Sequence, residues 1–485
     1  MKDARPDDDA DLCFMTAIDL AAQYGARSLS PVAVTRATLA RIDELNPIFN
    51  AYCLVDHEGA MAAAQASERR WESGAPLSRI DGVPTSIKDL ILTRGWPTLR
   101  GSKTVNRDQA WDQDAPATAR LREAGAVLLG KTATPEFGWR ASTDSPLTGV
   151  TRNPWDRSRT PGGSSGGAAA SVAAGMGALA VGTDGGGSIR IPAAFTGTVG
   201  IKPQFGRVPA WPASPMGTVA HLGPHARCVS DAAAMLDVLA RPDPRDGAAL
   251  APADHDFAGA AAGIAAAPPD LRGLRIAYSP TLGYVDCLDA EIAQALDTAA
   301  AIFESLGAIV EKKDPGFPDC HDVFMVHWMA SARDMLMKLP APQRALLDPG
   351  LHAAMEDAAR YTLADFLQAQ SQRLEISAAM RSLALSHDLL LTPATAVLPF
   401  ETGLIAPASE AAAGFAWFDW TWWTPYSTPF NLSQQPAIVL PCGKSASGLP
   451  IALQLVAPHH REALCIRAGA AYEAATPWCQ RRAPC

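Results

Sequence analysis

Hydrophobic positions in the first part of the chain recur at helical spacing. Apolar residues lie three and four positions apart with polar residues between them, which is the pattern of helices that bury one face. The pattern predicts three helices, over residues 16–24, 31–45 and 59–73. Ser30 is suited to cap the second helix with Pro31 at its first position, and Asn46-Pro47 is expected to end it. We expect these helices to cover the rest of the fold.

Farther along the chain, short apolar runs alternate with helical segments. The runs predict strands over residues 83–92, 127–131, 179–181, 199–201, 275–278, 308–311, 389–391 and 438–440. The segments between them predict helices over residues 115–124, 168–175, 231–239, 289–306 and 462–475. This alternation is typical of an α/β fold.

The composition changes between residues 240 and 273, where Ala, Pro and Gly dominate after the sequence Arg-Pro-Asp-Pro-Arg-Asp. A linker between two domains and a long surface loop inside one domain are both compatible with this segment. Residues 1–11 are charged, and we expect them to be flexible.

The overall composition indicates an acidic, soluble globular protein. The chain has 485 residues, of which 48% are hydrophobic and 19% are charged, and its formal net charge is -9. A protein that binds nucleic acid needs a basic face, so nucleic acid is not expected as the main partner. No apolar stretch is long enough to cross a membrane or to serve as a secretion signal. We therefore expect a cytoplasmic protein without membrane association.

The nine cysteines are scattered along the chain without a C-x-x-C pair. This distribution is typical of reduced thiols in the cytoplasm. No spacing of Cys and His residues indicates a zinc site, so we expect neither a metal nor another cofactor.

Two serine sites flanked by glycines lie between residues 160 and 202. Ser188 follows Gly185–Gly187, and three glycines allow a sharp turn whose N–H groups approach a ligand, as an oxyanion hole requires. A tight strand-to-helix turn with a capping serine fits the same residues. Ser164 lies at the centre of a G-x-S-x-G pattern, which occurs at nucleophile elbows but also in flexible Gly/Ser loops.

A serine nucleophile needs a base. His221 and His225 lie beside a glycine-containing turn, but each can equally be a buried structural histidine. Lys88 lies in an apolar run, where burial would lower its pKa and allow it to act as a base. By itself, Lys88 could also be an ion-paired lysine.

Taken together, these segments resemble the amidase signature family of serine hydrolases. The resemblance extends from about residue 16 to residue 475 and rests on the order and spacing of several motifs: Gly82-Val83-Pro84 with Lys88-Asp89, Gly130-Lys131-Thr132, Asn153-Pro154-Trp155, the stretch 161–167, Gly182-Thr183-Asp184 with Gly186-Gly187-Ser188, Gly200-Ile201-Lys202-Pro203, and Pro429-Phe430-Asn431-Leu432. It implies a central mixed, twisted sheet covered by helices on both faces. It also implies one domain over residues 12–485, with core motifs in 82–232 and a substrate-shaping part from about 273.

The resemblance further implies roles for individual residues. Ser188 would be the nucleophile, Ser164 a bridging serine and Lys88 the base, with a cis peptide bond between Gly163 and Ser164. The oxyanion would be bound by backbone N–H groups, those of Gly185, Gly186, Gly187 and Ser188. Three further residues would support this machinery: Ser165, Asp184 and Arg190.

The substrate pocket is less well indicated. The tract 415–426 is rich in Trp, Phe and Tyr, and it can pack in the core or line an apolar pocket. We consider Trp423 from this tract a candidate substrate contact. Three further candidate substrate contacts are Phe137, Gly138 and Trp139. By the resemblance, they correspond to a family segment that lies beside the acyl channel. Gly185 stands where the family usually has Ile or Thr, so this corner is expected to be wider.

The resemblance implies an amide hydrolase that cleaves a small or aromatic carboxamide through an acyl-enzyme. Alternatives are the A subunit of a tRNA-dependent amidotransferase and an amidase acting mainly on anilides, carbamates or amide oligomers. A glycine-loop anion-binding protein and an α/β-hydrolase that uses Ser164 are further alternatives. The expected partner is a small amide, and a homodimer is compatible with the resemblance.

Overall fold

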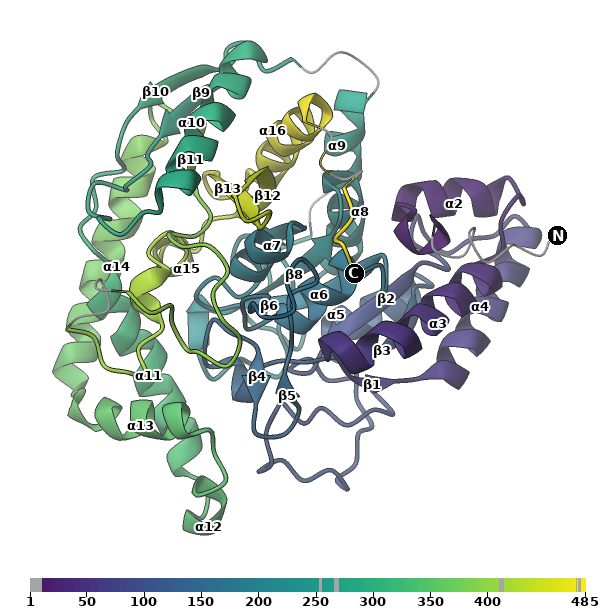
Figure 1. Cartoon of the computed structure of the whole chain (residues 1–485), viewed down its shortest axis with the longest axis horizontal. Helices are drawn as coiled ribbons and strands as arrows, with labels where there is room; N and C mark the ends of the chain where they lie inside the picture. Colours follow the sequence, from purple (N-terminus) through teal and green to yellow (C-terminus); the bar gives the residue numbers. More distant parts are fainter. Residues whose placement is uncertain (1–10, 253–254, 266–269, 410–413, 477, 479–480) are drawn as a thin grey trace.

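The computed structural model describes residues 11–252, 255–265, 270–409, 414–476, 478 and 481–485. The segment expected to be flexible, residues 1–11, lies outside the described residues except for Asp11. An 11-stranded sheet runs through the described chain, and helices pack on both of its faces (Figure 1). The α/β fold with a mixed central sheet is therefore confirmed.

The sheet combines parallel and antiparallel pairs. Across it, the strand order is β1 (Tyr52–Val55), β3 (Val127–Thr132), β2 (Pro84–Lys88), β6 (Leu179–Asp184), β8 (His221–Ala226), β7 (Val199–Lys202), β12 (Ala437–Lys444), β13 (Pro450–Val456), β11 (Leu389–Pro393), β9 (Arg275–Tyr278) and β10 (Ile309–Lys312). Strand β2 is parallel to both of its neighbours, whereas β8 is antiparallel to β6 and β7. A separate two-stranded ribbon consists of β4 (Asp144–Ser145) and β5 (Gly149–Val150).

The helices form a layer on each face of the sheet. One hydrophobic core joins the sheet to α2 (Ala17–Gly25), α5 (Pro116–Glu123), α8 (Val229–Leu239), α9 (Phe257–Ala265), α10 (Ala290–Ser305) and α16 (Glu462–Ala475). A second core on the other face contains α7 (Arg190–Thr196), α11 (His321–Met337), α13 (Pro349–Asp357), α14 (Leu363–Leu383) and α15 (Thr428–Leu432).

The remaining helices lie at the ends of the molecule or beside the site. Side chains of α3 (Pro31–Phe49), α4 (His57–Glu72) and α6 (Gly166–Ala173) pack with β1 and β3 in a third core. Figure 1 shows α2, α3 and α4 at one end of the molecule and α11, α13 and α14 at the other, from which α12 (Ala341–Arg344) projects. Single turns of 3₁₀ helix are η1 (Glu136–Gly138), η2 (Gly217–Val219), η3 (Ala358–Arg360) and η5 (Thr421–Trp423).

In strands β9, β11, β12 and β13, alternating side chains pack in the two cores. In β11, Leu389 and Leu391 pack with α10 and α16, whereas Leu390 packs in the core of α11 and α14. In β12, Ile438 belongs to the first core and Val439 to the second. This is the period of two expected of strands. Because both faces are buried, such strands appear in the sequence as continuous apolar runs.

Several predicted elements agree with the structure, and some do not. The strand over 275–278 and the helix over 462–475 have the predicted bounds. The prediction that Asn46-Pro47 ends the second helix is wrong. Pro47 is exposed within the last turn of α3, which continues to Phe49 and ends at Asn50, a left-handed residue with a φ of 50°. Strands β8 and β13 and helices α11 and α14 were not predicted.

Part of the segment between 240 and 273 is packed against the sheet layer. Helix α9 places Phe257 and Ala261 in the same core as α8 and α16. The backbone N–H of Phe257 donates to Oδ1 of Asp237 on α8 at 2.8 Å. Residues 257–265 are therefore a packed helix rather than extended chain.

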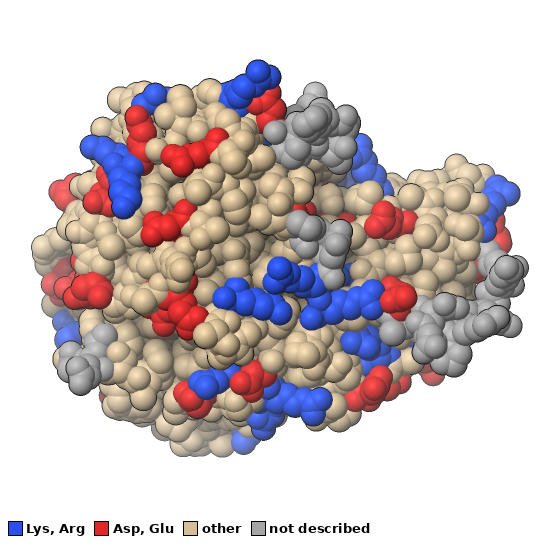
Figure 2. Space-filling model, turned by 45° about the horizontal axis from the view of Figure 1, so that its top comes forward, with Lys and Arg blue, Asp and Glu red and all other residues tan. Residues whose placement is uncertain are grey.

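The surface carries charges of both signs. On the face shown in Figure 2, a short row of Lys and Arg side chains lies near the centre, and other basic and acidic side chains are scattered over the rest of the face. Among the described residues, none of the helices has the length and hydropathy needed to cross a membrane. The same part of the chain holds no cluster of three His, Cys, Asp or Glu side chains suited to a metal ion.

Candidate active site

Two neighbouring parallel strands end at the candidate site. Lys88 is the last residue of β2, and Asp184 is the last residue of β6. Ligands of α/β sheets commonly bind beyond the carboxyl ends of such strands. The loop before α6 passes the same strand ends, so Ser164 and Ser165 contact Lys88 there. The fold thus brings together the three segments that the sequence analysis considered most informative.

The amine of Lys88 is surrounded by hydroxyl groups. Its Nζ lies within hydrogen-bonding distance of three side chains, those of Ser164 (2.7 Å), Ser165 (2.9 Å) and Thr183 (2.8 Å). Burial lowers the pKa of Lys88 well below its ordinary value of 10.5, and the charge of Asp184 opposes this shift only in part. The neutral amine is therefore available at a lower pH than it would be for an exposed lysine.

The hydroxyl of Ser165 helps to fix the orientation of the amine. It donates to the backbone carbonyl of Thr183 at 3.1 Å and accepts from the Thr183 N–H at 3.2 Å. Because its proton is used in this way, Ser165 accepts a hydrogen bond from Lys88. A neutral amine has two N–H groups and one lone pair, so the lone pair of Lys88 is left for the hydroxyl of Ser164 or Thr183. The position of Ser165 is that expected of a residue holding Lys88 to the loop.

The backbone around Ser164 is closely packed. The peptide bond between Gly163 and Ser164 is cis, as the resemblance implied. A Cβ added at Gly163 would lie 2.5 Å from the backbone oxygen of Ser142. Gly138 has a φ of 71°, and a Cβ there would lie 3.2 Å from Oγ of Ser164. Glycine at these two positions allows neighbouring backbone to approach Ser164.

The carboxylate of Asp184 organises the glycine turn that follows β6. It accepts hydrogen bonds from the N–H groups of Gly187 (2.8 Å) and Ile189 (3.2 Å). The Arg190 guanidinium donates to it from Nε at 2.9 Å and from Nη2 at 3.0 Å. Burial alone would raise the pKa of Asp184, but the charge and hydrogen bonds of Arg190 hold it well below its usual range. The ionised carboxylate thus fixes the turn before Ser188.

Arg190 is in turn held by residues from the C-terminal part of the chain. Its Nη1 donates to Oε1 of Gln454 at 2.8 Å, and its Nη2 donates to Oδ1 of Asn431 at 2.5 Å. Asn431 also donates from Nδ2 to the Asp184 carboxylate at 2.9 Å. All of these side chains are buried. The roles expected of Asp184 and Arg190 therefore depend on distant partners. Asn431 and Gln454 follow Arg190 by 241 and 264 positions in the sequence.

This hydrogen bonding corrects the expected set of oxyanion donors. The N–H of Gly187 is bonded to Asp184, so it is not available to a substrate oxygen. In the described part of the chain, no hydrogen bond uses the N–H groups of Gly185, Gly186 or Ser188. Three of the four expected donors therefore remain available.

The glycines of the turn are required by their neighbours. A Cβ added at Gly185 would lie 2.5 Å from Cζ3 of Trp328, and one at Gly186 would lie 2.5 Å from Cζ of Phe324. Gly187 has a φ of 115°, a conformation that side-chain-bearing residues rarely adopt. The expectation of a wider corner at Gly185 is wrong, because the indole of Trp328 fills the space.

Ser164 and Ser188 line the same cavity. A large part of the lining is apolar and comes from distant segments: Leu90, Ile91, Phe137, Met216, Leu222, Trp328 and Met335. The loop 210–216 contributes a continuous stretch of the wall and contains a cis bond between Trp211 and Pro212. An amide with an apolar body suits a cavity of this chemistry.

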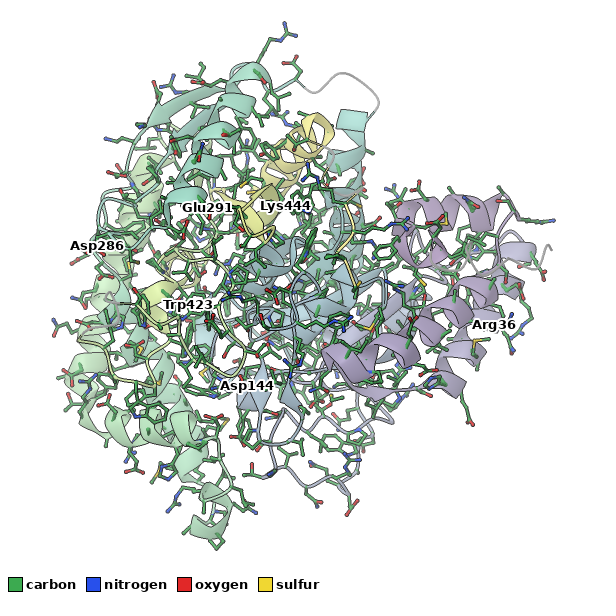
Figure 3. All side chains as sticks on the ribbon, viewed as in Figure 1. Arg36, Asp144, Asp286, Glu291, Trp423 and Lys444 are labelled. Carbon is green, nitrogen blue, oxygen red and sulfur yellow. The ribbon has the colours of Figure 1, made fainter. Side chains whose placement is uncertain are left out.

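Two of the four residues expected to contact the substrate lie elsewhere. Phe137 and Gly138 line the cavity, but Trp139 and Trp423 do not. Trp139 is 1% exposed, and its backbone oxygen accepts a hydrogen bond from Nε1 of Trp328 at 3.1 Å. Trp423 is 0% exposed and stacks on Phe195 with ring centroids 5.8 Å apart; Figure 3 shows it among the interior side chains near α15. Both are corrected to core residues.

The aromatic tract 415–426 is mainly packing. Phe418, Trp420, Trp422 and Tyr426 are buried, whereas Trp417 is exposed. Trp420 packs edge-on against Trp328, with ring centroids 5.9 Å apart. The tract therefore contacts the cavity wall from behind instead of forming it.

His221 and His225 are both buried beside the site. Burial lowers the pKa of His225 to about 3, with a smaller contribution from the charge of Lys88. Burial also lowers the pKa of His221, whose Nδ1 contacts the backbone oxygens of Asp184 (3.1 Å) and Val219 (2.8 Å). Both imidazoles are therefore neutral near pH 7.

The sequence analysis missed several residues of the site. Thr183 belongs to a motif that was identified, Gly182-Thr183-Asp184, so its contact with Lys88 had a signal in the sequence. Asn431 also lay in an identified motif without an assigned role. Trp328 and the loop 210–216 had no such signal, because neither carries a pattern that distinguishes a cavity wall from other buried or surface segments.

Comparison with known proteins shows the family to which the chain belongs. The family model described as Amidase matches residues 33–466. An acylamidase of Rhodococcus erythropolis is 36% identical over 479 residues, which cover 97% of this chain and 97% of that protein.

Two further relatives show the range of the family. The A subunit of the glutamyl-tRNA(Gln) amidotransferase of Myxococcus xanthus is 35% identical, over 97% of this chain and 99% of that protein. The crystal structure of a bacterial aryl acylamidase, described as an amidase signature enzyme, superposes with a TM-score of 0.88 at 30% identity, over 96% of this chain and 97% of that chain.

Proposed function

The chain belongs to the amidase family and is a hydrolase acting on amides, and we propose that it works through an acyl-enzyme formed on Ser188. In this proposal Lys88 is the base, and Ser164 relays protons between Lys88 and Ser188. The observation that carries it is the 2.7 Å contact between Nζ of Lys88 and Oγ of Ser164, made by a lysine that is fully buried. Ser188 lines the cavity into which Ser164 also opens.

The acylation half-reaction begins with neutral Lys88. As Oγ of Ser188 attacks the amide carbon, its proton passes to Ser164, and the Ser164 proton passes to Nζ. The carbonyl oxygen becomes an oxyanion, and the N–H groups of Gly185, Gly186 and Ser188 are in the turn that would bind it. Collapse of this intermediate breaks the carbon–nitrogen bond, and the relay runs backwards to protonate the leaving nitrogen. The products of this step are an ester on Ser188 and a free amine or ammonia.

The deacylation half-reaction uses water as the second nucleophile. Water gives a proton through the same relay to Lys88 and attacks the ester carbon. The ester bond to Ser188 then breaks, and Ser188 recovers its proton through Ser164. The carboxylate product leaves, and Lys88 is neutral again.

The cavity favours an amide with an apolar or aromatic body. Phe137, Leu90, Met335 and Trp328 supply hydrophobic walls, and the names of the acylamidase and aryl acylamidase relatives agree with such substrates. We propose a small or aromatic acylamide as the substrate class, with anilides or carbamates as further substrates. The A subunit of an amidotransferase is the second candidate, since the Myxococcus xanthus relative is 35% identical.

Three properties of the whole molecule complete the proposal. We propose that residues 12–485 form one domain and that the protein is cytoplasmic and acts without nucleic acid. The acidic net charge of -9 and the scattered cysteines support the last two statements. Light scattering would test whether the protein is a homodimer.

The central experiment is active-site labelling with a fluorophosphonate followed by peptide mapping. We expect the label on Ser188, and a label on Ser164 would contradict the assignment of the nucleophile. Ser188→Ala is expected to lose at least about 10³-fold in kcat/KM on an acyl anilide. The amidotransferase alternative predicts instead that B- and C-type subunits co-purify and that glutamine is hydrolysed in preference to acyl anilides.

A further inference from the structure

Arg100 is the only charged residue in the described lining of the cavity that contains Ser164 and Ser188. No Asp or Glu belongs to this described lining, and its one histidine, His221, is neutral because burial lowers its pKa well below the ordinary value. The described lining of this largely apolar cavity therefore carries a single positive charge. This contrasts with the protein as a whole, whose formal net charge is -9.

Among the described residues, none forms a hydrogen bond or an ion pair with the guanidinium of Arg100. Burial lowers its pKa, and the charge of Asp89 opposes this shift. Asp89 is already engaged by Nζ of Lys131 at 3.7 Å and by the N–H of Leu99 at 3.2 Å. Arg100 is only partly buried, so its guanidinium keeps some contact with solvent while facing no counter-charge in the cavity lining.

The backbone holds Arg100 beside the catalytic loop in an uncommon conformation. Arg100 has a φ of 58° and Phe137 a φ of 52°, both in the left-handed region that side-chain-bearing residues rarely occupy. The Phe137 N–H donates to the Arg100 carbonyl at 2.8 Å. Phe137 is followed by Gly138, which packs against Ser164. Such conformations persist at ligand sites when the surrounding structure enforces them.

Arg100 also lies at the junction of two cavities. A second cavity next to the first is lined by the stretch 109–113 and by Leu92, Thr98 and Val105, and it shares Arg100 and Trp211 with the first. Its one described acidic lining residue, Asp112, forms no ion pair with Arg100. A substrate group that extends beyond Phe137 and away from Ser188 would therefore meet Arg100.

We propose that Arg100 binds an anionic group, a carboxylate in the first instance, on the part of the substrate distal to the scissile amide. This inference rests on the proposed amidase function and narrows its substrate class to acidic amides. The planar guanidinium pairs with a carboxylate through two parallel hydrogen bonds, and such pairs are strong where water is excluded. The apolar walls then hold the body of the substrate between Arg100 and Ser188.

The test compares matched substrates that differ in one charge. On the acyl side, the pair is glutaric acid mono(4-nitroanilide), which keeps one free carboxylate, and the 4-nitroanilide of pentanoic acid. On the amine side, the pair is 4-acetamidobenzoate and 4-acetamidobenzamide. The readout is the ratio of kcat/KM for the anionic member to that for the neutral member.

We expect the wild-type ratio to exceed one for at least one pair. Arg100→Gln should lower that ratio by about 10- to 100-fold, the worth of hydrogen bonds to a charged group, and Arg100→Lys should lower it less. The control is Arg36→Gln, an exposed arginine on α3 at the far end of the molecule (Figure 3), which should leave the ratio at the wild-type value. Ratios of one or less in the wild type, or a ratio unchanged in Arg100→Gln, would overturn the inference while leaving the amidase function intact.

A binding measurement tests the role of Arg100 separately from the proposed amidase activity. In the Ser188→Ala background, calorimetry with the anionic member of the pair whose ratio exceeds one should show binding that Arg100→Gln weakens by a similar factor. Equal binding with and without Arg100→Gln would also overturn the inference. Failure of the wild type to hydrolyse either member of either pair would count against the proposed function itself.

Discussion

Trp328 occupies the space that a side chain at position 185 would need. A Cβ at Gly185 would lie 2.5 Å from Cζ3 and 3.0 Å from Cη2 of this indole, which also forms part of the cavity wall. The indole is held from behind by Trp420 and Phe324, with ring centroids 5.9 Å and 5.5 Å away. The small residue in the glycine turn and the large residue on α11 are therefore sterically coupled.

The first prediction concerns this pair. Gly185→Ala should lower the free energy of unfolding by about 1–3 kcal/mol, because the added methyl group overpacks the contact with Trp328. It should also lower kcat/KM, since the turn carries oxyanion donors. Combining it with Trp328→Leu should restore part of the lost stability. Urea denaturation of the two single variants and the double variant measures the coupling.

A matched control is available for the glycine substitution. Gly247 has open space around it, so Gly247→Ala should change stability by no more than about 0.5 kcal/mol. Additive effects of Gly185→Ala and Trp328→Leu would contradict the steric coupling.

The second prediction concerns Lys88 and pH. Only the neutral amine is a base, so kcat/KM should rise with pH through the lowered pKa of Lys88 and then level off. The rising limb should lie well below 10.5, the ordinary pKa of lysine. Lys88→Met should lose activity by several orders of magnitude while retaining the wild-type circular dichroism spectrum. Acyl anilide hydrolysis from about pH 5 to about pH 10 measures both effects.

A second pH readout does not depend on activity. The unfolded chain binds a proton at Lys88 over the range between the lowered pKa and 10.5, where the folded chain does not. Stability should therefore rise with pH across this range, and the rise should be shallower in Lys88→Met. Burial also lowers the pKa values of Lys131 and Lys202. These two lysines should therefore maintain part of the rise of stability with pH in Lys88→Met. Identical slopes in the wild type and Lys88→Met would show that Lys88 is charged in the folded protein.

The third prediction concerns the Asp184–Arg190 pair. Asp184→Asn should destabilise the protein by about 3–5 kcal/mol, because it leaves the buried Arg190 guanidinium without its counter-charge. It should also release the N–H of Gly187 from its strongest acceptor and lower kcat. Thermal unfolding and steady-state kinetics would measure these effects.

An exposed pair of the same type provides the control. Asp270 and Arg272 form a bidentate contact at the surface, where solvent screens the charges. Asp270→Asn should therefore leave both stability and kcat unchanged within error. Equal effects of Asp184→Asn and Asp270→Asn would contradict the structural role given to the buried pair.

The fourth prediction separates a core tryptophan from a cavity tryptophan. Trp423→Leu should lower stability by about 3 kcal/mol, the order of magnitude for truncating a buried aromatic residue, with the relative kcat/KM values of different substrates unchanged. Trp328→Leu should instead raise kcat/KM for bulkier acyl groups relative to acetyl. A panel of 4-nitroanilides with acyl chains of increasing size measures this selectivity. A change in selectivity in Trp423→Leu would place that residue back in the substrate site.

The sequence by itself determined the local elements and the chemical inventory of the site. The strand at 275–278 and the helix at 462–475 follow from periodicity, because side-chain alternation is a property of a few neighbouring residues. The motifs around Lys88, Ser164 and Ser188 were recognisable for the same reason, since each is short and contiguous. The helix end at Pro47 was predicted wrongly, because an exposed proline in a last turn costs less than one in the interior of a helix.

Only the tertiary structure decided how these parts are used. The sheet order brings Lys88 to within 2.7 Å of a serine 76 positions away. It also buries Trp423 while turning Trp328 and Arg100 to the cavity. A buried tryptophan and a cavity tryptophan have the same local sequence signature. They differ only in which distant segment packs against them, and that is set by long-range packing rather than by neighbouring residues.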